Sequence, residues 1–539
     1  MAEINSYDYI VIGSGSSGSI VASRLTEDPN VTVLLVEAGK PDSNPWLQVP
    51  LGFAKVHFDE SLTWRHKTEP EPNLGNRQVP WYRGKVLGGS SSINGLIYVR
   101  GAQLDYNIWR QMGAVGWSYE DVLPYFKKAE RQQHGASEYH GADGPLGVED
   151  AAWKNPLADA WIDAAVNIGI PRNDDFTGPQ LEGAGYYQMT TYKGRRASTA
   201  AAYLKPARNR PNLHIITEAL VTKVDIEDRV AKGITWVRGG QTHRSLARRE
   251  VIVSGGAVNS PQILQLSGVG PADLLASHGI EVKHDLPGVG ENLSDHLLSK
   301  RVYRVNSKYT FNTMMSNLFN QGAAGLRYAL NRSGQLSIGA ALAGVFTSTK
   351  PGLEAPDIQL FYCPFAPKVG VGELADFSGI HVSVGQNRPE SRGWVRIRSN
   401  DPRDLPAIHA NYLATELDRQ TVVEGLRIIE RISQAAPFSQ YVIEETEPGG
   451  KNLSDEDLLD WVRSSSYTGW HHCGTCKIGT DDMAVVDPEL RVHGIDRLRV
   501  IDGSVMPTVV SGNTNGACLM IGEKGADHVK ASAKSARAA

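Results

Sequence analysis

The sequence predicts an α/β protein built on two kinds of sheet: a doubly wound sheet, and an antiparallel sheet backed by helices. Three observations point to this fold class. The chain opens with a strand, a glycine turn, a helix and a second strand in succession. Strand patterns and a long amphipathic helix occupy residues 358–434, and 539 residues are enough for more than one domain.

The N-terminal stretch YDYIVIGSGSSGSIVASRL predicts a short buried strand, a glycine turn and a helix. An apolar run covers residues 9–12, and apolar residues recur at helical spacing over residues 19–25. Between them, Gly13, Gly15 and Gly18 form a GxGxxG motif. Glycines at this point let the backbone close on a pyrophosphate at a helix N-terminus, where free N–H groups and the helix dipole favour negative charge.

A second buried strand is expected over residues 31–36, and Glu37 ends it. An acid about 20 residues after the last glycine accepts hydrogen bonds from the ribose of a bound dinucleotide. Strand, helix and acid together make a complete Rossmann-like fingerprint, which an ordinary glycine-rich turn would not require. The fingerprint alone fits either NAD or FAD.

The second half of the chain carries different patterns. IQLFYCPF and IHVSVGQ predict strands by their β-branched and aromatic content, and GWVRIRS predicts another by its alternation. Residues 414–434 place apolar side chains at helical spacing and predict an amphipathic helix. We expect these elements to form the antiparallel sheet and its backing.

Composition and charge narrow the classes of function. A net charge of −4 and a pI near 6.4 offer nothing that recruits nucleic acid or an anionic membrane. Four cysteines are too few for a disulfide framework, which favours a reducing compartment. The N-terminus, MAEINSYDYIVIG, lacks a basic stretch followed by an apolar one, and no apolar run approaches the ~20 residues that span a bilayer. We therefore expect a cytoplasmic protein with no membrane span; peripheral membrane association stays open.

A second glycine-rich stretch, RGKVLGGSSSINGLIYVRG, covers residues 83–101 and leads into the strand-like LIYV. A loop with such small side chains lets the main chain lie against a large planar ligand, with N–H and hydroxyl groups as donors. Its interleaved apolar residues make a flexible linker a poor alternative.

This stretch resembles the first signature of the glucose–methanol–choline (GMC) oxidoreductases, a family of FAD enzymes. Residues 255–270, GGAVNSPQILQLSGVG, resemble the second signature, and residues 471–527 resemble the family's C-terminal block. With the N-terminal fingerprint, these motifs follow the family's order over almost the whole chain. The resemblance is nearest to the bacterial alcohol, choline and sorbose dehydrogenase branch, and it implies FAD as the cofactor.

The resemblance implies a discontinuous FAD-binding domain. Residues 1–150, 195–300 and 471–535 would join around the doubly wound sheet. Residues 151–194 and 301–470 would form the substrate-binding domain, and the substrate would lie between its antiparallel sheet and the flavin.

In this family a base takes the hydroxyl proton of an alcohol while hydride passes from the carbon to flavin N5, which gives an aldehyde or ketone. A histidine with a pKa near neutrality suits that base, and the resemblance places it at His471, in the pattern HxxGT. Asn513 would hold the substrate oxygen beside it. Some relatives link the flavin covalently through a histidine of the first signature. Ile93 stands at that position, so we expect non-covalent FAD.

The resemblance also implies which residues bind FAD. Asn515 would contact the flavin pyrimidine, and Asp502 with Gly503 would approach the phosphate and ribityl part. The backbone of Val221 would meet the adenine, and Asn94 would lie near the isoalloxazine. The full expected set is Gly13, Gly15, Ser16, Ser17, Gly18, Glu37, Ala38, Trp64, Arg83, Val86, Gly88, Gly89, Ser91, Asn94, Gly95, Val221, Ala257, Asp502, Gly503, Asn513, Thr514 and Asn515.

The stretch WHHCGTCKIG raises a metal site and a dithiol catalyst as alternatives. Structural zinc sites usually join two ligand pairs from separate turns, and no second CxxC or HxxxH occurs. In an extended segment His471 and His472 would point to opposite faces. Cys473 and Cys476 do not open a predicted helix, as a redox CxxC does. We expect no metal, a packing role for Cys476, and His472 as a candidate polar group at the active-site wall.

The substrate is less specified than the reaction. Choline-oxidising relatives face the trimethylammonium group with an acid, and Leu342 stands at that place in this sequence. Leu342 would therefore line the substrate wall, and a small, uncharged primary alcohol is the preferred substrate. A choline-type dehydrogenase and a flavin-dependent lyase on the same scaffold are the alternatives. Oxygen or a quinone or other carrier would accept the electrons.

Overall fold

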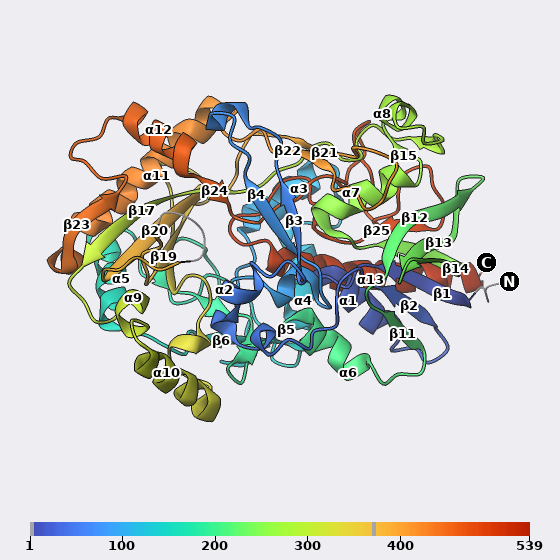
Figure 1. Cartoon of the computed structure of the whole chain (residues 1–539). Helices are drawn as coiled ribbons and strands as arrows, with labels where there is room; N and C mark the ends of the chain where they lie inside the picture. Colours follow the sequence, from blue (N-terminus) through green and yellow to red (C-terminus); the bar gives the residue numbers. More distant parts are fainter. Residues whose placement is uncertain (1–4, 369–372, 539) are drawn as a thin grey trace.

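The computed structural model describes residues 5–368 and 373–538, so the first four residues of the N-terminal segment lie outside it. Two large sheets lie side by side along the long axis of the molecule (Figure 1). The N-terminal sheet is at the right of that view and the second sheet at the left.

The first sheet has seven strands in the order β11–β2–β1–β14–β13–β12, with β25 also paired to β14. These strands are β1 Asn5–Ile12, β2 Val33–Val36, β11 Leu213–Ile216, β12 Leu220–Glu227, β13 Val230–Arg238, β14 Gln241–Val253 and β25 Leu498–Val500. Strands β11, β2, β1, β14 and β25 run parallel, whereas β12, β13 and β14 form an antiparallel meander. The parallel centre confirms the doubly wound class; β2 begins two residues later than its apolar pattern.

Two helices from opposite ends of the chain pack together beside this sheet (Figure 1). They are α1, Ser16–Leu25, and α13, Asn515–Ala538. Arg24 of α1 forms an ion pair with the fully buried Glu523 of α13 at 2.7 Å. A Cβ on Gly522 would lie only 3.0 Å from Ser17, so a glycine allows the close approach.

The second sheet is antiparallel and has the strand order β23–β17–β20–β19–β18–β7, with β24 paired to β17. Its strands are β7 Gly183–Tyr186, β17 Leu297–Val305, β18 Ala343–Thr347, β19 Ile358–Cys363, β20 Gly379–Gln386, β23 Val442–Glu447 and β24 Tyr467–Thr468. The strands predicted from IQLFYCPF and IHVSVGQ are confirmed as β19 and β20.

Helices back this sheet as expected. They are α5 Pro156–Asn167, α11 Glu416–Gln434 and α12 Asp455–Ser465. The predicted amphipathic helix is α11, which begins after Thr415 because the Thr415 side chain accepts a hydrogen bond from the Asp418 N–H and caps the helix. Its apolar face, including Leu426 and Ile429, is fully buried.

The two sheets draw on different segments of the chain. The second sheet takes β7 from the segment 151–194 and its other strands from residues 297–468, so β17 starts four residues before the expected boundary at 301. The division into two domains at those boundaries stays a prediction.

The prediction of a strand at LIYV is wrong. Residue Ile97 makes only an isolated bridge to Met189. Instead, Ile97 and Val99 pack with Phe346 and Phe361 in one apolar cluster against the second sheet. The apolar residues therefore serve tertiary packing rather than a ladder of backbone hydrogen bonds.

The strand expected at GWVRIRS is shorter and lies elsewhere. It is β21, Trp394–Arg396, which pairs with β22, Ala407–His409, in a separate two-stranded sheet. The Val395 N–H donates to the Gly290 carbonyl and the Val395 carbonyl accepts from the Gln265 amide, so its backbone serves the first half of the molecule.

The remaining elements surround these sheets. The helices are α2 Phe53–Val56, α3 Gln103–Gln111, α4 Tyr119–Ala129, α6 Lys205–Ala207, α7 Gly256–Leu266, α8 Ala272–Ser277, α9 Phe311–Met314 and α10 Leu318–Asn331. The small strands are β3 Thr63–Lys67, β4 Pro80–Gly84, β5 Glu130–Gln132, β6 Leu146–Asp150, β8 Gln188–Met189, β9 Thr191–Tyr192, β10 Arg195–Arg196, β15 Val269–Gly270 and β16 His284–Asp285. Among the described residues, none of the helices combines the length and apolarity needed to cross a bilayer.

Candidate active site

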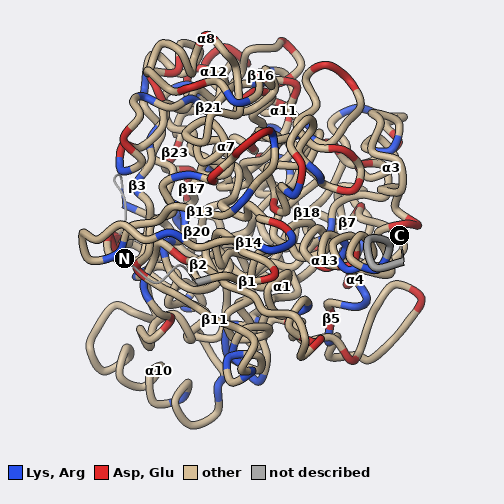
Figure 2. The backbone as a smooth tube through the Cα atoms, turned by 90° about the vertical axis from the view of Figure 1, so that its right-hand side faces the viewer, with Lys and Arg blue, Asp and Glu red and all other residues tan. Residues whose placement is uncertain are grey.

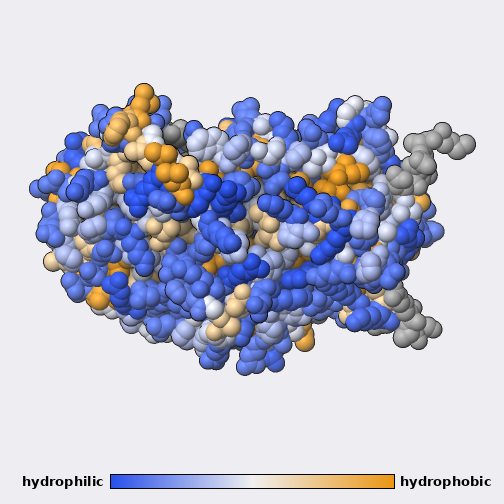
Figure 3. All heavy atoms as spheres, turned by 90° about the horizontal axis from the view of Figure 1, so that it is seen from below, coloured by the Kyte–Doolittle hydropathy of each residue, from blue (hydrophilic) through white to orange (hydrophobic). Residues whose placement is uncertain are grey.

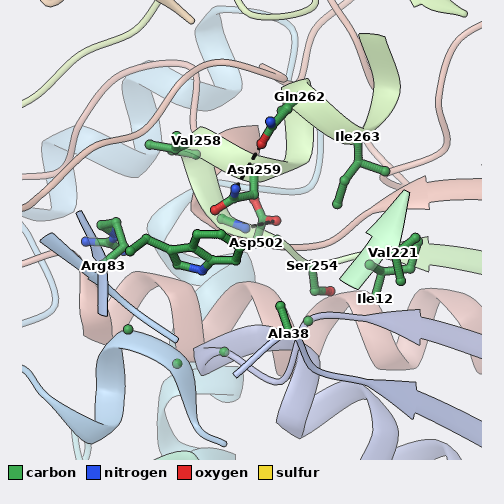
Figure 4. Close-up of a pocket in the computed structure, with 18 of the residues that line it drawn as sticks. Ile12, Ala38, Arg83, Val221, Ser254, Val258, Asn259, Gln262, Ile263 and Asp502 are labelled. Atoms are coloured by element: carbon green, nitrogen blue, oxygen red, sulfur yellow. Dashed lines mark hydrogen bonds between the residues drawn. The ribbon is translucent and has the colours of Figure 1, made fainter. Parts of the chain in front are cut away.

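A cavity that is open to solvent lies where β1 and β2 end and α1 begins. Its wall includes Ile12 and Val36, the last residues of these strands. Figure 4 shows Arg83 at one end of this cavity, and Ile12 and Val221 at the other. The crevice at the carboxyl ends of parallel strands is where such sheets bind extended ligands.

The fingerprint glycines shape the wall of this cavity. Gly13 has a φ of +93°, and a Cβ on Gly18 would lie 2.0 Å from the Gly13 carbonyl oxygen, so both positions require glycine. A Cβ on Gly15 would meet nothing within 4 Å, and the same holds for Gly256 across the cavity. These two glycines leave the cavity open where a ligand's phosphate groups would have to approach the backbone.

Two helix N-termini converge on this wall. Gly15 caps α1 without a side chain, so the first N–H groups of α1 have no capping partner. The Ser16 hydroxyl donates to Asn515 Oδ1 at 2.7 Å, which holds the start of α13 next to the start of α1. Both helix dipoles favour negative charge at this point. The donor set therefore fits the pyrophosphate of a dinucleotide.

The Glu37 carboxylate uses both acceptor positions of one oxygen but only one position of the other. Its Oε2 accepts from the Ser14 N–H and hydroxyl, and its Oε1 accepts from the Gly39 N–H. A carboxylate has about four acceptor positions, so one remains on Oε1 for a ribose hydroxyl. Burial raises the pKa of Glu37, while these hydrogen bonds oppose the rise.

The Asp502 carboxylate is bonded to the protein through both of its oxygens. Its carboxylate accepts from the Gly256 N–H and Ser260 hydroxyl on one oxygen, and from the Ser504 N–H and hydroxyl on the other. All four acceptor positions are filled by protein donors, so Asp502 ties α7 to the C-terminal block. It still lines the cavity.

The structure brings most of the expected FAD residues to one wall. Those on it are Gly13, Gly15, Ser16, Ser17, Glu37, Ala38, Trp64, Arg83, Gly89, Val221, Ala257, Asp502, Gly503 and Thr514. Those that do not line this cavity in the described structure are Gly18, Val86, Gly88, Ser91, Asn94, Gly95, Asn513 and Asn515. The roles of both groups stay predictions.

Sequence reasoning missed other residues of the wall. From the second signature it named only Ala257, whereas Val258, Asn259, Gln262 and Ile263 also line the cavity. Asn259 Nδ2 donates to Gln262 Oε1 at 3.0 Å (Figure 4). The glycine-rich signature was a sufficient signal for these. Residues 402–405 complete the wall from far along the chain, and no motif marks them.

A chain of hydrogen bonds crosses the junction of the two sheets. His296 Nε2 lies 3.0 Å from the Asn387 carbonyl oxygen, His296 Nδ1 lies 2.9 Å from His471 Nδ1, and His471 Nε2 lies 3.0 Å from Asn513 Nδ2. The Asn513 Oδ1 accepts from Gln359 Nε2 at 3.3 Å, which orients the amide.

This series of hydrogen bonds assigns the tautomers of both histidines. A carbonyl oxygen can only accept, so His296 carries its proton on Nε2 and accepts on Nδ1. His471 must then donate from Nδ1, which leaves a lone pair on His471 Nε2, where the Asn513 amide donates to it. The histidine predicted as the base thus presents an unprotonated nitrogen.

Electrostatics keeps His471 neutral. Burial, His296 and Arg83 hold the pKa of His471 well below its usual 6.5. The Arg83 guanidinium donates to the Trp470 carbonyl at 3.0 Å, next to His471 in the chain.

Two further ionisable groups, Asp295 and His472, lie next to His471. Asp295 accepts from the His471 backbone N–H at 2.8 Å and from the hydroxyls of Tyr412 and Thr468, and burial raises its pKa to about 6. His472 stacks on Trp81, with ring centroids 3.5 Å apart, and lines the cavity, whereas His471 does not. Neighbouring histidines therefore face different partners, and burial holds the pKa of His472 well below 6.5 as well.

Leu342 is not on the cavity wall. It is fully buried in the apolar core of the second sheet, and its N–H donates to the Tyr362 carbonyl. Its expected place at the substrate wall stays a prediction that this packing does not favour.

The cysteines of the CxxC are fully buried free thiols, and burial raises the pKa of Cys473 and of Cys476. A thiol so far from ionisation is a poor nucleophile. Across residues 5–368 and 373–538, no group of three or more His, Cys, Asp or Glu residues is placed to hold a metal ion.

A cavity that fits a dinucleotide therefore lies close to a neutral imidazole. This combination is typical of one class of protein, the oxidoreductases that use a bound nucleotide cofactor. Residues 7–298 match the N-terminal family model described as GMC oxidoreductase, and residues 389–522 match the C-terminal one. The chain belongs to the GMC oxidoreductase family and is an FAD-dependent alcohol oxidoreductase.

Similar proteins include bacterial enzymes and solved structures. The chain is 44% identical over 531 residues to the oxygen-dependent choline dehydrogenase of Escherichia coli, covering 97% of this chain and 95% of that protein. It is 43% identical to the enzyme of the same name from Burkholderia ambifaria, covering 97% and 93%. A formate oxidase structure has a TM-score of 0.91 at 28% identity, covering 99% and 100%, and a pyridoxine 4-oxidase structure from Mesorbium loti has 0.87 at 29%, covering 97% and 98%.

Proposed function

We propose that the protein oxidises a small, uncharged primary alcohol to the aldehyde and that His471 Nε2 accepts the hydroxyl proton. The observation that carries this proposal is the chain from the Asn387 carbonyl through His296 to His471, because it leaves the lone pair on the nitrogen beside Asn513. Bound FAD supplies the two-electron acceptor for the carbon.

The residues around His471 would bind the alcohol and take its proton. An alcohol oxygen that inserts between Asn513 and His471 accepts from Asn513 Nδ2 and gives its proton to His471 Nε2. Arg83 donates to the Trp470 carbonyl next to His471, and from there its positive charge would stabilise negative charge that develops on the alcohol oxygen. The cavity wall from Gly15 to Thr514 would hold the cofactor.

The surroundings of His471 support an uncharged substrate. The carboxylate nearest to it, Asp295, is already bonded to the His471 N–H, Tyr412 and Thr468, and Arg83 contributes a positive charge. Neither group favours a trimethylammonium ion. Choline is the second candidate, and what favours it is the name of the relatives that are 43–44% identical.

A panel of alcohols separates these two substrates. FAD-loaded protein is mixed anaerobically with short aliphatic alcohols, aromatic alcohols, hydroxymethyl heterocycles and choline, and bleaching of the flavin absorbance is followed. We expect an uncharged primary alcohol to bleach faster than choline at equal concentration. Faster bleaching by choline would make choline oxidation the function, and bleaching by no alcohol at all would leave the lyase alternative.

The electron acceptor and the compartment are part of the proposal. We propose oxygen as an acceptor, since the names of the relatives that are 43–44% identical include oxygen dependence. Peroxide release in air, compared with dye reduction without air, distinguishes oxygen from a quinone or other carrier. The reaction takes place on the cytoplasmic side of the cell, in keeping with four unpaired cysteines.

We propose that FAD is held without a covalent bond. Ile93 stands where some relatives have a histidine, and its side chain is buried with Leu47, Val56, Leu62 and Val86. Acid denaturation of the yellow protein should release all flavin into the supernatant after precipitation. Flavin that stays in the pellet after washing would contradict this.

The His296→Ala variant tests the positioning role of His296. Without the acceptor on His296 Nδ1, the tautomer of His471 is no longer fixed, so flavin reduction should slow by about 10-fold or more. His296→Gln, whose amide oxygen can accept the Nδ1 proton, should recover part of the rate. An unchanged rate in His296→Ala, or no recovery in His296→Gln, would make His296 merely structural.

A further inference from the structure

Helix α10 exposes an apolar face that no other part of the described chain covers. The residues of this face are Leu318, Phe319, Leu326 and Leu330, with exposed fractions of 84%, 85%, 61% and 71%. Positions 318, 322, 326 and 330 are four residues apart and lie in one row on the helix. Figure 3, seen from the side on which α10 lies in Figure 1, shows apolar side chains gathered on the surface there.

Little of α10 packs against the protein itself. Among its fourteen residues only Ala324 and Tyr328 are buried. The Tyr328 hydroxyl donates to the Gly194 carbonyl at 2.9 Å, which ties the helix to the hairpin of β9 and β10. Short helices depend on burying an apolar face for their stability. A contiguous exposed apolar face of this kind marks an interaction surface.

The charged side chains of the segment that contains α10 all have one sign. From Ser307 to Lys350 the sequence contains no Asp or Glu. Four cations lie on α10 or next to it: Arg327 is in the helix, Arg332 is its C-cap, and Lys193 and Arg195 flank Gly194 of the hairpin, which Tyr328 contacts. In the described part of the chain, none of these four has an ion-pair partner. Figure 2 shows Lys and Arg but no Asp or Glu along α10.

The carboxylate that contacts the hairpin is that of Glu149 on β6, and it is already bound. It accepts from the Thr191 hydroxyl and from the backbone N–H groups of Lys193 and Gly194. The side chain of Lys193 therefore remains available to an anion outside the protein.

We propose that the α10 face, defined as the four apolar residues and these four cations, docks on the surface of a bilayer that contains anionic phospholipids. The leucines and the phenylalanine enter the boundary between headgroups and acyl chains, and the cations meet lipid phosphates. The protein as a whole carries a net charge of −4, so this cationic face also sets the orientation of docking.

A second copy of the chain fits this face less well. Four side chains expose on the order of 500 Å², whereas a stable dimer buries about 800 Å² on each partner. In a two-fold dimer, the same unpaired cations would also face one another. Neither the small area of the face nor repulsion between its cations disfavours docking on a bilayer surface.

Vesicle sedimentation tests the proposal with the full-length, FAD-loaded protein. We expect it to sediment with phosphatidylcholine vesicles that contain phosphatidylglycerol, and about 10-fold less with phosphatidylcholine alone. L326Q/L330Q and R327Q/R332Q should each weaken binding to the anionic vesicles by about 10-fold or more. These side chains are exposed or border solvent, so FAD content and alcohol oxidation should not change.

The control variant is I443Q, on strand β23 of the second sheet, where an isoleucine is 59% exposed beside acidic residues. It should bind vesicles like the wild type. The proposal is overturned if the wild type sediments with neither vesicle, or if L326Q/L330Q binds as well as I443Q. It is also overturned if light scattering shows a dimer that L326Q/L330Q converts to a monomer while vesicles bind neither, since a second copy would then occupy the face.

Discussion

Replacing His471 with alanine is expected to leave FAD bound and to slow flavin reduction by an alcohol about 10²- to 10⁴-fold, the usual contribution of a positioned base. His471 does not line the cofactor cavity, so replacing it should not release FAD. Asn513 would keep its orientation through Gln359, but no neutral nitrogen would accept the hydroxyl proton. Stopped-flow bleaching of the flavin without oxygen measures the effect.

His134→Ala is the matched control for this variant. Its side chain is 62% exposed and pairs only with Asp150 in the described structure. It should bleach at the wild-type rate. Bleaching at that rate in His471→Ala as well would remove His471 from the chemistry.

Replacing Gly15 with alanine is expected to abolish most FAD binding while the protein still folds. Gly15 has a φ of −66°, which any residue adopts, and an added Cβ meets no protein atom within 4 Å. The Cβ would point into the space next to the N-terminus of α1, where the phosphates must approach the backbone. We expect FAD affinity to fall about 100-fold or more, since each lost phosphate contact is a charge-assisted hydrogen bond.

Two other glycines serve as controls for Gly15. Gly18→Ala should destabilise the fold itself, because its Cβ would lie 2.0 Å from the Gly13 oxygen. Gly325→Ala, on α10 with open space around it, should bind FAD normally. FAD titration by fluorescence and thermal unfolding of each variant distinguish the two effects. Normal FAD affinity in Gly15→Ala would contradict the position proposed for the pyrophosphate.

Local patterns predicted much of the fold. The first strand, the glycine turn and α1 depend on residues that are neighbours in the chain, so the spacing of Gly13, Gly15 and Gly18 was enough to predict them. The same is true of α11, whose apolar spacing and Thr415 cap are both local. The prediction of a strand at LIYV failed because a short apolar run has the same pattern in a strand and in a packed loop. Only the neighbouring sheet decides which of the two it becomes.

The site was less predictable because its parts come from distant segments. His471 could be located through the pattern HxxGT, but its tautomer depends on His296, which is 175 positions earlier, and on the Asn387 carbonyl. Nothing near Asp-His at 295–296 distinguishes a histidine that faces His471 from one that faces solvent. Residues 402–405 reach the cavity through the path of a loop, and no sequence pattern encodes that path.

The pH dependence of anaerobic flavin reduction by one reactive alcohol tests the central claim most directly. A neutral His471 is the active form, and burial with Arg83 lowers its pKa, so protonation removes activity only at acid pH. The rate constant of the wild type should be level through neutral pH and fall only well below pH 6.5, and His471→Gln should lack this acid limb. A fall centred at or above pH 6.5, or the same acid limb in His471→Gln, would contradict His471 as the base.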